Sequence, residues 1–175
     1  MKKNHAIKEK KIPIEKLGAK LEHEPDLKFA EKIYAKFSKA EIYVVGGTVR
    51  DLAMGRADSK DYDLVIRNVP VKELGALLTK LGSVDLVGAR FGVFKFVPKN
   101  SQLDNAIDIA LPRTEVAFGT GGYRDFETQS DPRLPIEDDL GRRDFTWNAL
   151  AWEIKQKKLV DPFGGQAHIK DKMIV

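Results

Sequence analysis

Asp61 and Asp63 stand two residues apart at the start of a short apolar run, residues 64–66. On a β-strand, side chains at positions i and i+2 project from the same face, so both carboxylates should point to one spot. Two ionised carboxylates repel each other there. A hard divalent cation such as magnesium, which takes oxygen ligands, offsets that repulsion. The spacing therefore predicts a magnesium site at the start of a strand over residues 61–66.

A glycine pair precedes these carboxylates. Gly46 and Gly47 follow a β-branched and aromatic run, residues 42–45, and lead into a short predicted helix over residues 48–54. Bare backbone N–H groups and the positive end of a helix suit a phosphate group. Arg50 adds a fixed cation on that helix. A phosphate-binding turn and metal-binding carboxylates in one strand–helix–strand unit would indicate phosphoryl or nucleotidyl transfer.

Each feature also has a simpler interpretation. An Asp-x-Asp pair is commonly a solvated strand end, a Gly-Gly pair is commonly a turn, and an Arg–Asp pair on a helix commonly contributes little energy. The combination, in this order along the chain, favours the functional interpretation.

Asp108 is a third candidate carboxylate. It lies between two isoleucines in a predicted strand over residues 106–111. A carboxylate is costly to bury alone, so Asp108 either points to the wet face of a half-exposed sheet or joins Asp61 and Asp63. Three converging carboxylates can hold two magnesium ions about 3.5–4 Å apart, and such a pair stabilises the attacking and the leaving oxygen of an in-line displacement.

Residues 136–152 form a second dense stretch, which we predict to be helical. Asp144 and Asn148 are four residues apart and would share a helix face. Such a pair can accept from and donate to sugar hydroxyls. Arg143 would lie on the same helix, either at a site or on a solvated face. Gly141 inside this helix would cost about 1 kcal/mol relative to Ala.

The stretch between these motifs, residues 112–135, is rich in glycine and shows little periodicity, so we predict a long loop. A loop of this length in a compact domain is usually functional. Arg113, at its start, could reach a phosphate or could simply pair with Glu115.

Composition limits the remaining possibilities. The 175 residues suffice for one domain, and 42% hydrophobic and 32% charged residues are typical of a globular protein. Cysteine is absent, which excludes a disulfide framework. No segment has the apolar core of a signal peptide or the length of a membrane span, so we expect a cytoplasmic protein.

The positive charge is unevenly distributed. Residues 1–20 hold seven lysines against two glutamates, a charge of +5, so the total of +4 leaves −1 for the remainder. We predict a basic, flexible extension over residues 1–24, which is either a solvated arm or a contact to RNA phosphates. Helices predicted over 25–40 and 70–81, strands over 84–87 and 91–97, and a hairpin over 152–160 complete an α/β domain, residues 25–175, with one mixed sheet packed with helices.

The motifs together resemble one family. The segments VVGGTVRDLAMGRADSKDYDLVI, IDIALPRTE, GRRDFTWNALAW and LVDPFGG are similar, in this order, to motifs of class II tRNA nucleotidyltransferases, the CCA-adding enzymes, and of the related bacterial poly(A) polymerases. The resemblance covers about residues 42–174, and the ordered motifs make it highly specific.

The resemblance implies a head domain of the polymerase-β-like nucleotidyltransferase fold. It implies transfer of a nucleoside monophosphate from CTP or ATP to an RNA 3′ end, that of tRNA, with two Mg²⁺ ions and release of pyrophosphate. Asp61, Asp63 and Asp108 would be the catalytic metal ligands. The nucleotide-binding residues it implies are Gly46, Gly47 and Arg50 at the triphosphate, Arg113 and Arg143 at the nucleotide, and Asp144 and Asn148 at the ribose.

Some features depart from the family pattern. The position of Trp147 is usually aliphatic, and Gly141 is unusual. In the family a neck, body and tail follow the head, and the neck carries the template that selects the base. The sequence here ends at Val175, which is expected of a fragment, of one half of a split enzyme with a C-terminal partner chain that supplies these parts, or of a compact variant. Poly(A)-type adenylyl addition is the alternative activity, and a non-catalytic RNA- or partner-binding module is the alternative class.

Overall fold

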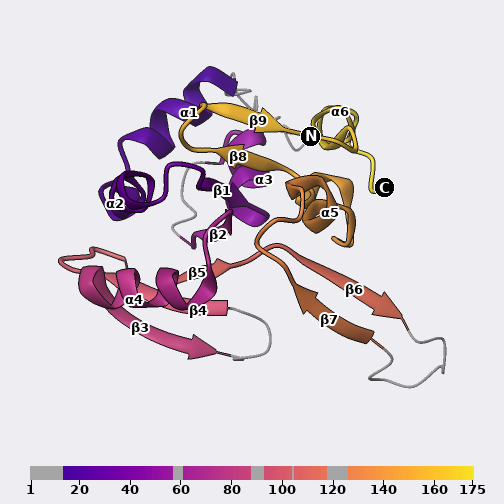
Figure 1. The fold of residues 1–175 in the computed structure, drawn as a ribbon. Coiled ribbons are helices and arrows are strands. Elements are labelled where there is room, and N and C mark those ends of the chain that lie inside the picture. The colour runs from indigo at the N-terminus through magenta and orange to yellow at the C-terminus, as the bar shows by residue number, and fades with distance from the viewer. Residues whose placement is uncertain (1–13, 57–60, 88–92, 104, 118–125) are drawn as a thin grey trace.

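The computed structural model describes residues 14–56, 61–87, 93–103, 105–117 and 126–175. Its main feature is a seven-stranded sheet whose strands lie side by side in the order β3-β4-β5-β2-β1-β8-β9 (Figure 1). Their bounds are β1 (Glu41–Val45), β2 (Asp63–Arg67), β3 (Gly82–Val87), β4 (Val93–Pro98), β5 (Ile107–Ala110), β8 (Ala151–Glu153) and β9 (Lys158–Val160). Strand β2 runs parallel to β5, and the other neighbours are antiparallel. The mixed α/β fold expected from the sequence is confirmed.

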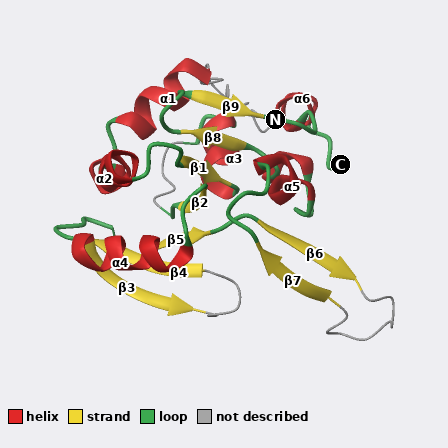
Figure 2. Cartoon of the chain, viewed as in Figure 1, coloured by secondary structure: helices red, strands yellow, loops and turns green. Residues whose placement is uncertain are grey.

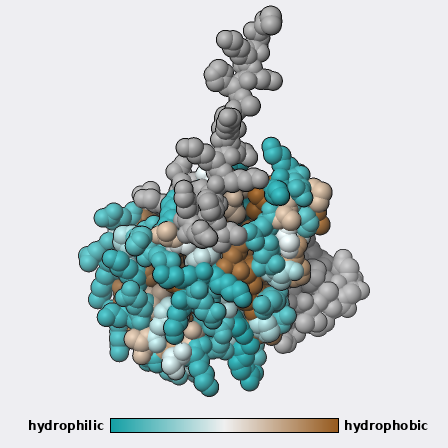
Figure 3. Space-filling view, turned by 90° about the horizontal axis from the view of Figure 1, so that it is seen from above, coloured by the Kyte–Doolittle hydropathy of each residue, from teal (hydrophilic) through white to brown (hydrophobic). Residues whose placement is uncertain are grey.

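Helices lie on both faces of this sheet (Figure 2). They are α1 (Ile14–Glu22), η1 (Pro25–Leu27), α2 (Phe29–Lys36), α3 (Gly47–Ala53), α4 (Val71–Leu81), α5 (Ile136–Gly141), η2 (Thr146–Asn148) and α6 (Gly165–Asp171). No described helix is long and apolar enough to cross a membrane. Seen from above, the surface is mostly hydrophilic, with smaller hydrophobic areas (Figure 3).

Strand alternation divides the core into two clusters. In β1, Ile42 and Val44 belong to the large cluster that also contains buried side chains of helices α1, α2, α3 and α4. Tyr43 and Val45 point to the opposite face and pack in a small cluster with α5. The small cluster contains residues of α5, β1, β2 and β8 but none of β4 or β5. On that face of the sheet, β4 and β5 therefore remain partly open, and the candidate site lies there.

Two predicted elements differ in the structure. Residues 136–152 are not one helix: α5 ends at Gly141, Phe145 is extended (φ −140°, ψ 143°), and only the short η2 turn follows. The chain has to leave the helix there because Ala149 is already packed in the small cluster, from which β8 continues. Gly141 therefore lies at the end of a helix and not inside one.

Residues 112–135 are not a long loop. Strands β6 (Arg113–Ala117) and β7 (Phe126–Ser130) pair as an antiparallel ribbon, which projects away from the main sheet (Figure 1). Helix α1 was also not predicted: it lies within the segment expected to be an extension, and its Leu21 is buried in the large cluster. Residues 1–13, with most of the lysines of that segment, lie outside the described residues.

Candidate active site

Three polar side chains lie in a row across the open face of the sheet. Lys95 on β4 is the register partner of Asp108 on β5, and Asp108 is the parallel-register partner of Asp63 on β2. Asp63 in turn is opposite Val45, the last residue of β1. Alternation explains the row, because the neighbours Phe94, Phe96, Ile107, Ile109 and Leu64 point into the large cluster. We call Asp63 and Asp108, with Lys95, the charged row.

The raised pKa of Asp63 indicates a carboxylate that is surrounded by protein and lies among other negative charges. The residue as a whole is exposed, yet enough protein surrounds the carboxyl that burial is the main cause raising its pKa above the ordinary value. The neighbouring charges of Asp108 and Asp61 raise the pKa further, while Arg143 and Lys95 lower it. Negative charge at Asp63 is thus unfavourable by itself and would be stabilised by an added cation.

Asp61 is placed differently from the sequence prediction. Strand β2 begins at Asp63, so Asp61 precedes the strand. Its Oδ1 accepts a hydrogen bond from Asn105 Nδ2 (2.7 Å), and its backbone carbonyl accepts one from Thr48 Oγ1 (2.5 Å). The second bond ties the Asp61 backbone to helix α3.

Asp61, Asp63 and Asp108 do not surround one common point at which a metal ion could bind. Among the residues that the structure describes, no three Asp, Glu, His or Cys side chains are close enough together to hold a metal ion. Each carboxylate has its own neighbour instead: Asn105 at Asp61, Lys95 at Asp108 and Arg143 near Asp63. Their chemistry nevertheless fits a hard divalent cation, since all three offer anionic oxygens and Asp63 and Asp108 occupy paired positions.

The Gly46 turn lies directly against this row. Gly46 is buried, and its backbone N–H donates to the carbonyl of Leu150 (3.4 Å). It has φ +70° and ψ −134° at the start of α3, a conformation that glycine adopts without steric cost. A Cβ atom there would lie 3.0 Å from Arg143 Nη1 and 3.6 Å from Asp63 Oδ2. Glycine therefore lets the turn, a cation and a carboxylate occupy one small region.

Arg143 is held in place by a residue whose role the sequence did not reveal. Asp139 on α5 is fully buried. Its Oδ2 accepts a bond from Arg143 Nη2 (3.3 Å), and its Oδ1 accepts from Arg142 Nη2 (2.9 Å) and from the backbone N–H of Arg113 (3.4 Å). Its one sequence signal is a position three and four residues before two arginines.

A second chain of contacts joins α3 to η2. Arg50 Nη1 donates to Asn148 Oδ1 (2.8 Å), and Asn148 Nδ2 donates to Asp144 Oδ1 (3.2 Å). Arg50 Nε also donates to Asp51 Oδ1 (2.9 Å). Asp144 and Asn148 are therefore adjacent as predicted, although they do not share an α-helix.

The structure thus brings most of the predicted site residues to one end of the sheet. Gly46, Asp63 and Arg143 lie together, and Gly47 is close to Arg50, whose Nη2 is 3.6 Å from the position of a Cβ at Gly47. Arg113 opens β6 and is joined to the same region through Asp139.

Comparison with known proteins agrees with this arrangement. The family model described as the poly A polymerase head domain matches residues 42–175. The multifunctional CCA protein of Stenotrophomonas maltophilia strain K279a is 37% identical over 134 residues, which is 77% of this chain and 30% of that protein. The multifunctional CCA protein of Vibrio parahaemolyticus is 38% identical over 135 residues, again 30% of its length. The chain thus spans about a third of these relatives.

Solved structures of similar fold point the same way. The CCA-adding enzyme of Bacillus stearothermophilus in complex with CTP superposes with a TM-score of 0.63 at 29% identity, covering 86% of this chain and 33% of that one. The Thermotoga maritima CCA-adding enzyme complexed with tRNA gives a TM-score of 0.61 at 26% identity, covering 93% and 35%.

Proposed function

Because this chain belongs to the family of poly(A) polymerase head domains, we propose that it is the catalytic head of an RNA nucleotidyltransferase that transfers a nucleoside monophosphate to a tRNA 3′ end. The observation that carries the proposal is the pairing of Asp63 with Asp108 directly beside the Gly46 turn and Arg143. Carboxylate oxygens that could bind a metal ion next to groups suited to a triphosphate support the proposal, because nucleotidyl transfer needs that combination.

Asp61, Asp63 and Asp108 would hold two magnesium ions. When bound, such ions neutralise the charge on the triphosphate and on the attacking and leaving oxygens. The raised pKa of Asp63, caused by burial and then by Asp108 and Asp61, supports this assignment because an added cation would favour the ionised carboxylate beyond what Arg143 and Lys95 do.

The remaining residues would orient the nucleotide. The Gly46–Gly47 turn and the guanidinium of Arg143 would bind triphosphate oxygens, with Arg50 beside them. Asp139 would keep Arg143 in place during this binding. Asp144 and Asn148, already hydrogen-bonded to each other, would contact the ribose, and Arg113 would contact the nucleotide from β6.

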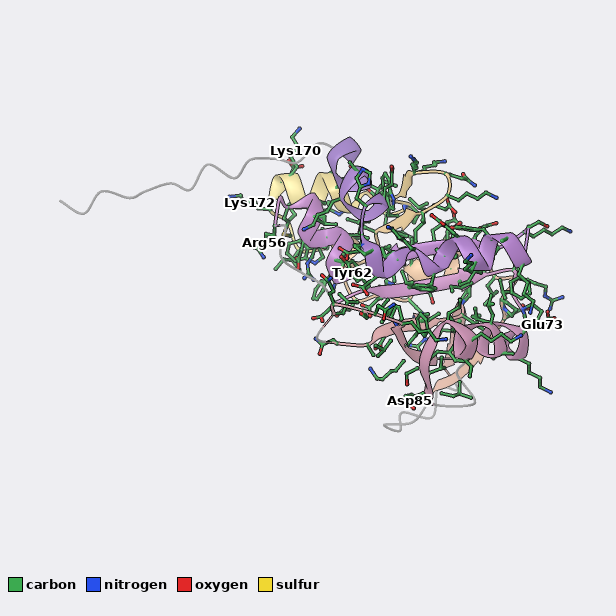
Figure 4. All side chains as sticks on the ribbon, turned by 90° about the vertical axis from the view of Figure 1, so that its left-hand side faces the viewer. Arg56, Tyr62, Glu73, Asp85, Lys170 and Lys172 are labelled. Atoms are coloured by element: carbon green, nitrogen blue, oxygen red, sulfur yellow. The ribbon has the colours of Figure 1, made fainter. Side chains whose placement is uncertain are left out.

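A tRNA 3′ end would approach from the same side. In Figure 4, Tyr62 marks the start of β2, and Arg56, Lys170 and Lys172 lie on that side of the molecule. All three cations are exposed, so they can contact phosphates without a desolvation cost. One solved tRNA nucleotidyltransferase is complexed with a primer tRNA and an incoming ATP analog, and it superposes with a TM-score of 0.60 at 26% identity. This relative supports the proposal that the chain acts on tRNA and a nucleoside triphosphate.

The test is pyrophosphate release and nucleotide incorporation with CTP or ATP, magnesium and tRNA transcripts that end before or after the terminal CCA. We expect release that requires magnesium and RNA, and loss of at least about 100-fold in Asp63→Asn and Asp108→Asn, because each removes a metal ligand. The incorporated nucleotides distinguish CCA addition from poly(A)-type addition.

Glu73→Gln is the matched control. Glu73 is an exposed carboxylate on α4, far from Tyr62 and the start of β2 (Figure 4), so its substitution should leave the rate unchanged. Nucleotide incorporation that persists in Asp63→Asn would contradict the proposal, and binding of RNA without any transfer would favour the non-catalytic alternative.

A further inference from the structure

Lys95 is a cation on the sheet that no part of the proposed mechanism uses. It stands on β4 between Phe94 and Phe96, which are buried, and therefore points to the open face. Its Nζ donates to both carboxylate oxygens of Asp108, at 2.8 Å to Oδ1 and 3.2 Å to Oδ2. The ammonium thus covers the oxygens that a metal ion would need.

The contact is specific to the acidic site. Lys95 has two register neighbours, Asp85 on β3 and Asp108 on β5, and of these two it is Asp108 that it bonds. Lys95 therefore pairs with one of the two carboxylates that form the charged row with it.

Lys95 can also move away from Asp108, whereas Arg143, the cation near Asp63, is held in place. Its side chain is 49% exposed, and that of Asp108 is 41% exposed. A solvated ammonium on a flexible stem can move into water at little cost. Arg143 is 19% exposed and is anchored by the fully buried Asp139, so it stays where it is.

We propose that Lys95 is a built-in counter-cation of this site, which a divalent metal ion must displace from Asp108 in order to bind. Without metal, Lys95 offsets the repulsion between Asp108 and Asp63. With metal, the ion replaces it and the ammonium turns to solvent. Lys95 thereby raises the metal concentration at which the site fills. This inference rests on the proposed metal-binding role of Asp63 and Asp108.

The experiment is a titration of the full chain with Mn²⁺, without nucleotide, followed by the electron spin resonance signal of the free ion. Lys95→Met removes the charge and keeps most of the stem. We expect Mn²⁺ to bind Lys95→Met about fivefold more tightly than the wild type, the upper range for one exposed ion pair. Lys99→Met, just beyond the end of β4, is the matched control and should bind like the wild type.

A double-mutant cycle shows whether the effect passes through Asp108. In an Asp108→Asn background, Lys95→Met should no longer tighten Mn²⁺ binding. Mn²⁺ affinity in Lys95→Met that equals that of Lys99→Met, or is weaker than the wild type, would overturn the inference, and so would a gain that persists in Asp108→Asn.

Asp63→Asn separates this inference from the proposed function. If the wild type binds Mn²⁺, Asp63→Asn abolishes binding and Lys95→Met has no effect, the metal site stands and the role of Lys95 is wrong. If the wild type binds no Mn²⁺, or Asp63→Asn binds it as well as the wild type does, the assigned metal site is wrong and the role of Lys95 falls with it.

Discussion

At the scale of single residues, Asp63 connects the chemistry of the site with the stability of the chain. Burial, Asp108 and Asp61 raise its pKa in the folded protein. A carboxyl whose pKa is raised on folding binds its proton more tightly when folded, so it destabilises the fold increasingly as the pH rises from the unfolded pKa of about 4 through the folded pKa. Above the folded pKa the full destabilisation is present.

Asp63→Asn should therefore raise the midpoint of thermal unfolding of the metal-free protein at pH 7. The advantage should shrink as the pH falls through the folded pKa of Asp63 and should vanish below about pH 4, where the wild-type carboxyl is protonated in both states. Thermal unfolding followed by circular dichroism between pH 4 and pH 8 measures it. Asp85→Asn, on the exposed strand β3, is the control, and an equal gain in both variants would contradict the account.

Residue types and spacing predicted much of this site. Strand alternation places Asp108 on one face, and its pairing with Asp63 follows from the two strands being neighbours. The anchoring of Arg143 by Asp139 could not be predicted in the same way, because its importance depends on complete burial of the carboxylate. The predicted strand over residues 61–66 began too early, since Asp61 precedes β2, although the charge of Asp61 still adds, after burial and Asp108, to the raised pKa of Asp63.

At the scale of elements, α5 acts as the support of the site. It contributes Ile136 and Leu140 to the small cluster, and its Asp139 joins the arginines after the helix to the first residue of β6. One helix of six residues thus fixes Arg143 and the base of the β6–β7 ribbon.

Asp139→Ala should lower the free energy of unfolding by about 3–5 kcal/mol, because it leaves buried guanidinium groups without their carboxylate. Urea denaturation at pH 7 measures the loss. The adjacent Asp138 is exposed, so Asp138→Ala should change the free energy by no more than about 0.5 kcal/mol. Similar losses in the two variants would show that Asp139 does not support the fold in this way.

The two elements that were mispredicted share a physical cause. The break after α5 follows from packing of Ala149 and Ala151 against the sheet, and the β6–β7 ribbon follows from pairing between residues as far apart as Arg113 and Ser130. Neither contact is local, so neither leaves a clear periodicity in the sequence. The helix α4 and the strands β1 and β4, whose apolar patterns are local, were predicted correctly.

At the scale of the whole molecule, the assigned contacts fall on metal, phosphate and ribose. In the described part of the chain, the grouped residues are carboxylates, arginines and a glycine turn at one end of the sheet. Contacts to phosphate position a nucleotide without reading its base, and base discrimination requires buried hydrogen-bonding groups that a wrong base leaves unpaired.

The 175-residue chain should therefore bind CTP, ATP, GTP and UTP with similar affinity. Calorimetric titration of the four nucleotides in magnesium, with non-reactive analogues, measures the differences. A preference above tenfold for one base, which corresponds to about 1.4 kcal/mol, would show that these residues include a base-reading element, and the β6–β7 ribbon would be the first place to substitute.

The central claim is that Asp63, Asp108, Gly46 and Arg143 form one metal-dependent nucleotide site, and the most direct test compares binding of a non-reactive CTP analogue with and without Mg²⁺. The account predicts that Mg²⁺ tightens binding to the wild type by at least about tenfold, and that Asp63→Asn loses this gain while retaining the weaker metal-free binding through Arg143. Nucleotide affinity that is the same with and without Mg²⁺ in the wild type, or a Mg²⁺ gain that survives in Asp63→Asn, would contradict it.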